Sequence, residues 1–479
     1  MPKRPKTAVV SALLLTVLAL TSCTSTVDGR AVSIYEDPFQ VAGLPTTSGP
    51  SGPRSGVADS TLTAVGAVGD EYDRLALNAI DDIQSYWRAE YSKDFSGAFT
   101  PVPKFYSWDA QQSQDSQFCQ QTTRHLVNAA YCRLDNSIGW DRGMLLPTMT
   151  KAFGKMSVVM VLAHEYGHAV QTMAELVTGR TPTIVKEQQA DCFAGAFMRH
   201  VAEGGAKHFT INTADGLNKV LAATVAIRDA DPSDPDSVHG SAFERVTAVQ
   251  IGFTDGPKGC KAIDMNDITR RRKNLPQSYG NDADHGELPI TQHNLAELAK
   301  AMNSIMPVPS APAYDYRGAK LGCADASDTE PVTYCPATNT IGTDVPALAA
   351  RAKANSADQT DFPTQIGGDY NAYIVFISRY TLAVQNNLHQ RLSGAKTGLR
   401  ASCLSGVITA KLASPTRTIA NGDLALSPGD LDKAVSGLLT DGLAASDIQG
   451  NTVPSGFSRV DAFRAGVLGN QQTCESRYA

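Results

Sequence analysis

The chain contains an internal repeat, so its fold has to be one that can be built twice in tandem. Asn, Ile, Gly and Asp follow the pair Tyr131-Cys132, and the same residues follow Tyr334-Cys335 at the same spacing. Two later segments match in the same order, 190–195 with 401–406 and 245–260 with 459–474. The offset between the copies stays within roughly 203 to 214 residues. We therefore interpret the chain as a tandem duplication.

A length of 479 residues predicts two or three domains, and the repeat places their boundaries. We expect a lipoprotein signal peptide, a flexible tether, a first copy, a linker and a second copy at residues 1–22, 23–61, 62–262, 263–287 and 288–479. The tether is expected because Ser, Thr, Pro and Gly dominate its sequence.

Apolar periodicity predicts a chain that is α+β and mainly helical. Helices are expected near residues 80–87, 158–171, 184–201 and 216–230, and a short strand near 136–140. Ser157 is the expected N-cap of the second of these helices.

The N-terminus has the pattern of an export signal. Three basic residues precede an apolar run from Ala8 to Leu20, which is too short to span a bilayer comfortably. The sequence Leu20-Thr21-Ser22-Cys23 resembles a bacterial lipobox. We expect Cys23 to be lipidated and to anchor the protein at the extracytoplasmic face of the cell membrane. The alternative is a plain secretory signal with an incidental cysteine.

The charge of the chain argues against a nucleic-acid partner. The formal net charge is −6, and phosphate binding requires clustered Lys and Arg. Loss of Lys3, Arg4 and Lys6 with the signal peptide would take it from −6 to −9. One basic run, 270–273, is interpreted as a solvated part of the linker.

The cysteine content indicates an oxidising compartment. Nine cysteines are present, and an even number remains when Cys23 is set aside. Because each copy has two cysteines close together and two far apart, the repeat suggests the pairs Cys119–Cys132, Cys192–Cys260, Cys323–Cys335 and Cys403–Cys474. A thiolate metal ligand at Cys192 is the less favoured alternative, because Cys403 recurs without a metal motif.

His164, Glu165 and His168 form a His-Glu-X-X-His motif in the first copy. On a helix the two imidazoles lie one turn apart on the same face and can bind one zinc ion. Glu165 would lie beside the metal and act as a general acid and base. The alternative is a surface helix that carries two His and a Glu by chance.

Two carboxylates downstream can complete such a site. A catalytic zinc site uses three protein ligands and leaves one position open. Glu187 can be the third ligand, and Asp191, one helical turn later, can accept a hydrogen bond from a ligand imidazole. The alternative is an ordinary charged helix face.

The segments His-Glu-Tyr-Gly-His-Ala-Val-Gln and Glu-Gln-Gln-Ala-Asp-Cys-Phe-Ala-Gly together resemble the neutral zinc metallopeptidase family of bacteria, a gluzincin-like group. The resemblance covers about residues 70–262 and extends to the Tyr131-Cys132 segment, His239-Gly240-Ser241, Arg245, Gly252-Phe253 and Cys260. It implies two tandem zincin-like domains, with one Zn²⁺ in the first. It also implies that His164, His168 and Glu187 bind the zinc and that Glu165 is the general base.

His239 has two open interpretations. In gluzincins a further His commonly stabilises the oxyanion, and His239 could serve in that role. It could equally be a structural residue that caps a turn.

The second copy lacks the metal motif. Alignment through Ala383-Val384-Gln385 places other residues at the five functional positions of the first copy: Ser378 for His164, Arg379 for Glu165, Leu382 for His168, Gly398 near Glu187, and Ser402 for Asp191. We interpret residues 288–479 as a degenerate pseudo-peptidase repeat.

The expected function is that of a membrane-anchored, extracytoplasmic zinc metallopeptidase acting on a peptide or protein substrate. One alternative is a non-catalytic interaction or scaffold lipoprotein of the cell envelope that retains its zinc. Another is a zinc hydrolase that acts on a non-peptide amide.

Overall fold

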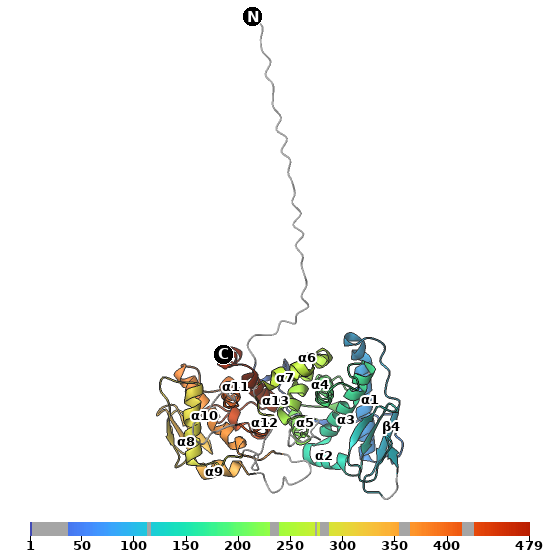
Figure 1. Ribbon diagram of the computed structural model, residues 1–479, viewed down its shortest axis with the longest axis horizontal. Helices are drawn as coiled ribbons and strands as arrows, with labels where there is room; N and C mark the ends of the chain where they lie inside the picture. The colour runs from blue at the N-terminus through green and yellow to red at the C-terminus, as the bar shows by residue number, and fades with distance from the viewer. Residues whose placement is uncertain are drawn as a thin grey trace. The chain divides into compact units, whose positions relative to one another are not determined.

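The computed structural model describes Met1 and residues 37–112, 116–229, 239–273, 275–277, 287–353, 365–413 and 426–479. The expected signal peptide and Cys23 lie outside these residues. Tyr35–Ala479 form one compact unit of mixed helices and strands, mainly helical as predicted (Figure 1). None of the described helices is long and apolar enough to cross a membrane.

The first repeat begins with α1 (Glu71–Asp94), a helix that starts where the Asp70 carboxylate accepts the N–H groups of Tyr72 and Asp73. A three-stranded sheet follows in the order β4 (Lys104–Trp108), β8 (Ser137–Asp141), β7 (Ala129–Cys132). β4 is parallel to β8 and β7 is antiparallel to it, so β7 forms one edge of this sheet. A short hairpin, β5 (Gln117–Phe118) with β6 (Gln121–Thr122), precedes β7.

Six helices complete the first repeat. They are α2 (Leu145–Phe153), α3 (Lys155–Met173), α4 (Thr183–Ala202), α5 (Asp215–Ala226), α6 (Ala242–Lys261) and α7 (Met265–Arg272). The expected helices near 80–87, 158–171 and 184–201 and the strand near 136–140 are confirmed. The helix expected over 216–230 ends at Ala226. Ser157 is not an N-cap, because α3 begins after Gly154 and the Ser157 hydroxyl donates to the Gly154 carbonyl at 2.7 Å.

The described residues of the second repeat have the same order of main helices and the same three-stranded sheet, without counterparts of the β5–β6 hairpin and β9. Its sheet runs β10 (Ala313–Asp315), β12 (Thr340–Thr343), β11 (Val332–Cys335), again with one parallel and one antiparallel pair. Its helices are α8 (Gln292–Ile305), α9 (Val345–Arg351), α10 (Tyr370–Asn387), α11 (Ala395–Leu412), α12 (Asp430–Thr440), α13 (Gly456–Leu468) and α14 (Gln471–Arg477), with a 3₁₀ turn η2 (Leu443–Ala445). This correspondence supports the duplication.

A glycine contact brings two helices together in the same way in both repeats. A Cβ on Gly252 of α6 would lie 1.8 Å from the Cys192 carbonyl oxygen of α4, and Gly466 of α13 has the same relation to Cys403 of α11. Only glycine permits such an approach between backbones. The four disulfides predicted from the repeat are confirmed: Cys119–Cys132, Cys192–Cys260, Cys323–Cys335 and Cys403–Cys474.

The prediction that residues 23–61 form a free tether is wrong for residues 37–61. β1 (Gln40–Val41) pairs with β2 (Leu44–Pro45), and β3 (Gly52–Pro53) pairs with β9 (Phe209–Thr210) of the first repeat. The Val41 side chain is fully buried, and the Ser51 hydroxyl accepts the backbone N–H of Asn212 at 3.0 Å. Polar side chains of this segment therefore form hydrogen bonds with the first repeat rather than with solvent.

The interpretation of the basic run 270–273 as a solvated linker is wrong for Arg271 and Arg272, whereas Arg270 and Lys273 are exposed. Arg270 to Arg272 form the last turn of α7. Arg271 is 8% exposed and donates to Gln188 at 2.5 Å, and Arg272 pairs with Glu244 at 2.6 Å. These arginines therefore attach α7 to the first repeat.

Candidate metal centre

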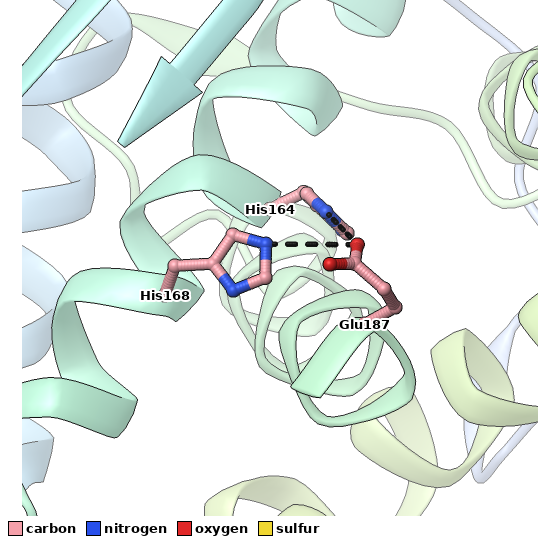
Figure 2. A group of neighbouring side chains, drawn as sticks. All are labelled: His164, His168 and Glu187. Atoms are coloured by element: carbon pink, nitrogen blue, oxygen red, sulfur yellow. Dashed lines mark ion pairs between the residues drawn. The ribbon is translucent and has the colours of Figure 1, made fainter. Parts of the chain in front are cut away.

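Close packing of α3 on α4 creates the centre. A Cβ on Gly167 of α3 would lie 2.9 Å from the Cα of Ala190 on α4, so a side chain at this position would push the helices apart. His164 and His168 lie one turn apart on α3, and Gly167, where α3 packs on α4, lies between them in the sequence. Both imidazoles point toward the Glu187 carboxylate of α4 (Figure 2).

The three side chains have the spacing of ligands around one small cation. Oε2 of Glu187 lies 3.2 Å from Nε2 of His164 and 3.6 Å from Nε2 of His168. Tetrahedral zinc with bonds of about 2.0–2.1 Å separates its ligand atoms by about 3.4 Å. The residues predicted as ligands are thus brought together, with their donor atoms all within 4.8 Å of one another.

The outer nitrogen of each imidazole has its own acceptor. Nδ1 of His164 lies 2.8 Å from Oδ1 of Asp191, and Nδ1 of His168 lies 3.0 Å from Oε1 of Gln171. With the proton on Nδ1, both Nε2 lone pairs face the carboxylate oxygen. Three converging lone pairs repel one another unless a cation lies between them, so the donor set fits a bound metal ion.

The electrostatics of the cluster also favour positive charge. Burial lowers the pKa of His164, but the carboxylates of Asp191, Glu187 and Glu165 outweigh that effect and raise it to about 10. Burial raises the pKa of Glu187, but its contacts with His164 and His168 outweigh burial and hold that pKa well below its usual range. The same field would attract a divalent cation.

Asp191 is held by Arg245, a residue for which the sequence predicted no role. Nε and Nη2 of Arg245, on α6, donate to its two carboxylate oxygens at 2.8 and 2.7 Å. Nη1 of Arg245 donates to the Ile227 carbonyl at 2.6 Å, and the guanidinium is almost fully buried. The only indication of its importance in the sequence is that Arg245 is one of the residues that carry the resemblance to the metallopeptidase family.

Glu165 stays outside the ligand set. Its Oε2 accepts the backbone N–H of Tyr131 on the edge strand β7 at 2.9 Å. Glu165 and His164 line one cavity of about 230 Å³, together with apolar side chains from α2, α3 and α5 that include Leu145, Met149, Met160, Val161 and Ile227. A carboxylate is therefore available beside the metal position at the wall of a cavity.

His239 lies at the same cavity, further from the centre than the three ligands. Its Nε2 is 4.0 Å from Oε2 of Glu187, and its side chain is 44% exposed. Asp229 holds it by accepting its backbone N–H at 2.6 Å, and the Asp229 carboxylate lies 3.2 Å from its Nδ1. The structure thus brings His239 to this cavity, with its backbone N–H and its Nδ1 both at the Asp229 carboxylate.

Comparison with known proteins finds relatives in mycobacteria. An uncharacterized protein of Mycobacterium bovis and two of Mycobacterium tuberculosis are each 26% identical over 168 residues. The match covers 30% of this chain, and the chain spans 57% of the length of these relatives. No family model matches, and no solved structure matches.

The corresponding volume in the second repeat is filled by protein. Nε and Nη2 of Arg379 donate to the Val332 carbonyl of β11 at 3.0 Å and to the Ser446 hydroxyl at 3.1 Å. A Cβ on Gly398 would lie 2.3 Å from the Ala445 carbonyl oxygen, so η2 occupies the space beside α11. Ser378, Leu382 and Ser402 are fully buried.

A second group of potential ligands, Cys323, Asp325 and Cys335, lies near the sheet of the second repeat. Both sulfurs are joined in a disulfide, which leaves no thiolate for a metal.

Proposed function

We propose that the first repeat is a zinc-dependent peptidase of the neutral zinc metallopeptidase type. The observation that carries this proposal is the arrangement of three convergent ligand atoms next to Glu165, a carboxylate that lines one cavity with His164 and does not belong to the ligand set. A structural zinc usually has four protein ligands, whereas three ligands with an open position are typical of catalysis. The metal proposed is Zn²⁺ because it prefers nitrogen and carboxylate ligands at this spacing.

The side chains around the cavity have distinct tasks. Zinc, when bound, would polarise a substrate carbonyl and lower the pKa of a water molecule. Glu165, oriented by the Tyr131 N–H, takes the proton from the attacking water as the new C–O bond forms. It then delivers that proton to the leaving nitrogen as the C–N bond breaks. His239, whose Nδ1 lies against the Asp229 carboxylate, can donate a hydrogen bond from Nε2 to the oxyanion that develops on the carbonyl when both of its ring nitrogens are protonated.

The test is cleavage of a degenerate peptide library by zinc-loaded protein that starts after the signal peptide. We expect cleavage by the wild type, its loss on chelation, and a loss of at least about 10²-fold in kcat for Glu165→Gln, with zinc content unchanged. Equal activity of Glu165→Gln would remove Glu165 from its role as general base.

Two other functions are distinguished when non-peptide amides are tested beside the peptide library. A chain that binds one zinc but cleaves no peptide, with or without Glu165, fits an envelope scaffold that retains its metal. A chain that cleaves other amides in a Glu165-dependent way fits a non-peptide amide hydrolase.

We also propose that the protein is held at the extracytoplasmic face of the membrane by a lipid on Cys23, as the lipobox indicates. Mass spectrometry of the mature N-terminal peptide should find an acylated Cys23. An unmodified Cys23 would contradict the anchor.

A further inference from the structure

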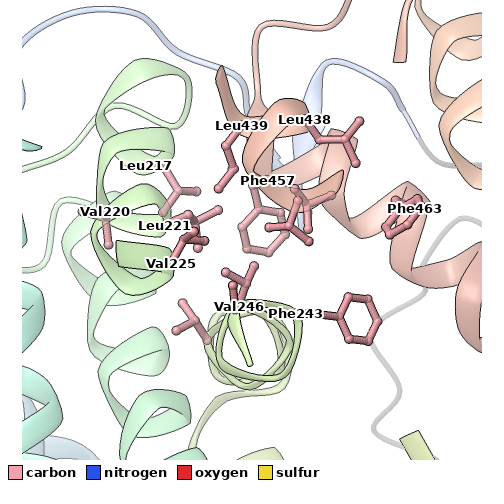
Figure 3. Packing of buried hydrophobic residues seen from close by; sticks show 14 of the residues in the cluster. Leu217, Val220, Leu221, Val225, Phe243, Val246, Leu438, Leu439, Phe457 and Phe463 are labelled. Atoms are coloured by element: carbon pink, nitrogen blue, oxygen red, sulfur yellow. The ribbon is translucent and has the colours of Figure 1, made fainter. Parts of the chain in front are cut away.

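The two repeats share an apolar interface between equivalent helices. α5 and α6 of the first repeat pack against α12 and α13 of the second. Leu217, Leu221, Val225, Phe243 and Val246 of the first repeat lie in one buried cluster with Leu439, Phe457 and Phe463 of the second (Figure 3). The degenerate repeat is therefore in direct contact with the helices that carry part of the metal centre.

One carboxylate of the second repeat, that of Asp432, contacts the first repeat across this interface. Asp432 of α12 is 4% exposed. Its Oδ1 accepts the backbone N–H of Phe243 in the first turn of α6 at 3.0 Å, and its Oδ2 lies 3.4 Å from Nε of Arg228, just after α5. The first N–H groups of a helix have no partner inside the helix, so Asp432 satisfies one of them.

The two groups held by Asp432 flank the segment that presents His239. Asp229 directly follows Arg228, and its Oδ2 accepts the N–H groups of His239 and Gly240 at 2.6 and 2.7 Å. Gly240 and Ser241 then lead into α6, where Asp432 holds Phe243. A single side chain of the second repeat thus contacts both Arg228, the neighbour of the residue that holds His239, and Phe243, in the helical turn that follows Ser241.

We infer that the degenerate repeat completes the active site of the first repeat, with Asp432 acting as a positioning residue for His239. This inference rests on the proposed function, in which His239 Nε2 faces the substrate. In this role the second repeat needs no metal ligands of its own. Asp432 does not line the cavity, so it would act on the site only through the position of His239.

The experiment is a double-mutant cycle on the full mature chain. Asp432→Ala should lower kcat about tenfold through misplacement of His239, with KM and zinc content unchanged. In a His239→Ala background the same substitution should have no further effect, because both changes then remove one interaction. An equal loss of kcat in both backgrounds, or no loss in either, would overturn the inference. If Asp432→Ala does not fold, Asp432→Asn takes its place: it keeps the acceptor for the Phe243 N–H but loses the charge that pairs with Arg228, so we expect a smaller loss of kcat that is again absent in the His239→Ala background.

Asn218→Ala is the matched control. Asn218 lies on α5 and joins the same interface, where its Oδ1 accepts the Gly456 N–H at 2.6 Å, away from the His239 segment. We expect this variant to keep the kcat of the wild type.

The contacts of Asp432 with Arg228 and Phe243 form a clamp on the residues around His239. Amide hydrogen exchange tests this clamp independently of catalysis. The His239 and Gly240 amides should exchange at least about tenfold faster in Asp432→Ala than in Asn218→Ala. Equal exchange in the two variants would refute the clamp. If the wild type proves inactive on peptides while these amides respond, the proposed peptidase fails and the clamp stands.

Discussion

At the metal centre, two residues that do not face the metal decide how the ligands are held. Asp191 orients His164, and Arg245 orients Asp191 through two hydrogen bonds. Asp191 and Arg245 are both almost fully buried, so neither charge is compensated by water. The positive charge of Arg245 also keeps Asp191 ionised, since it outweighs burial and holds the pKa of Asp191 below its usual range.

Asp191→Asn should therefore weaken zinc binding by about 10- to 100-fold, because His164 loses the carboxylate that fixes its tautomer. Competition with a chromophoric chelator measures the affinity. Asp82→Asn is the control, since Asp82 forms a similar buried pair with His208 at 2.7 Å outside the metal centre. Unchanged zinc affinity in Asp191→Asn would show that Asp191 serves only packing.

At the scale of helices and strands, the sequence predicted what depends on local pattern. The helix that carries His164 and His168 follows from apolar periodicity, and the disulfide pairs follow from the repeat. The sequence could not predict that Ser51 bonds to Asn212 or that Arg272 pairs with Glu244. Polar residues are expected to face solvent unless their partners in the fold are known. Arg245 was missed as the partner of Asp191 for a related reason, since 54 residues separate them in the chain.

The approach of α3 to α4 depends on the missing side chain of Gly167. Gly167→Ala should force the helices apart, destabilise the fold by about 1–3 kcal/mol and weaken zinc binding, because Glu187 would move away from both histidines. Thermal unfolding with and without zinc measures both effects. Gly179→Ala, with no atom within 4 Å of the new Cβ, should change neither. A wild-type zinc affinity in Gly167→Ala would show that the centre tolerates a wider helix spacing.

Across the whole molecule, the two repeats pack their helices alike, while among the described residues only the first has the His-His-Glu group that could hold a metal. Arg379 and η2 fill the second site, yet α12 and α13 still bury Leu438, Phe457 and Phe463. The interface buries charge as well as apolar surface. Asp432 lies within it, and burial, only partly offset by Arg228 and the α6 N–H groups, raises its pKa to about 6.

This pKa makes the interface sensitive to pH in a defined direction. An unfolded Asp has a pKa of about 3.9, so the folded chain binds the Asp432 proton more tightly than the unfolded chain does. Its contribution to stability is fully present below about pH 4 and is lost as the pH rises through about 6. The wild type should therefore lose about 2 kcal/mol relative to Asp432→Asn between pH 4 and pH 7, because the folded and unfolded pKa values differ by about 2, each pKa unit corresponds to about 1.4 kcal/mol, and a small part of the effect lies below pH 4. Urea unfolding at several pH values measures this difference, and Asn218→Ala should run parallel to the wild type. A difference that stays constant with pH would show that folding does not raise the pKa of Asp432, because Arg228 and the α6 N–H groups then offset its burial.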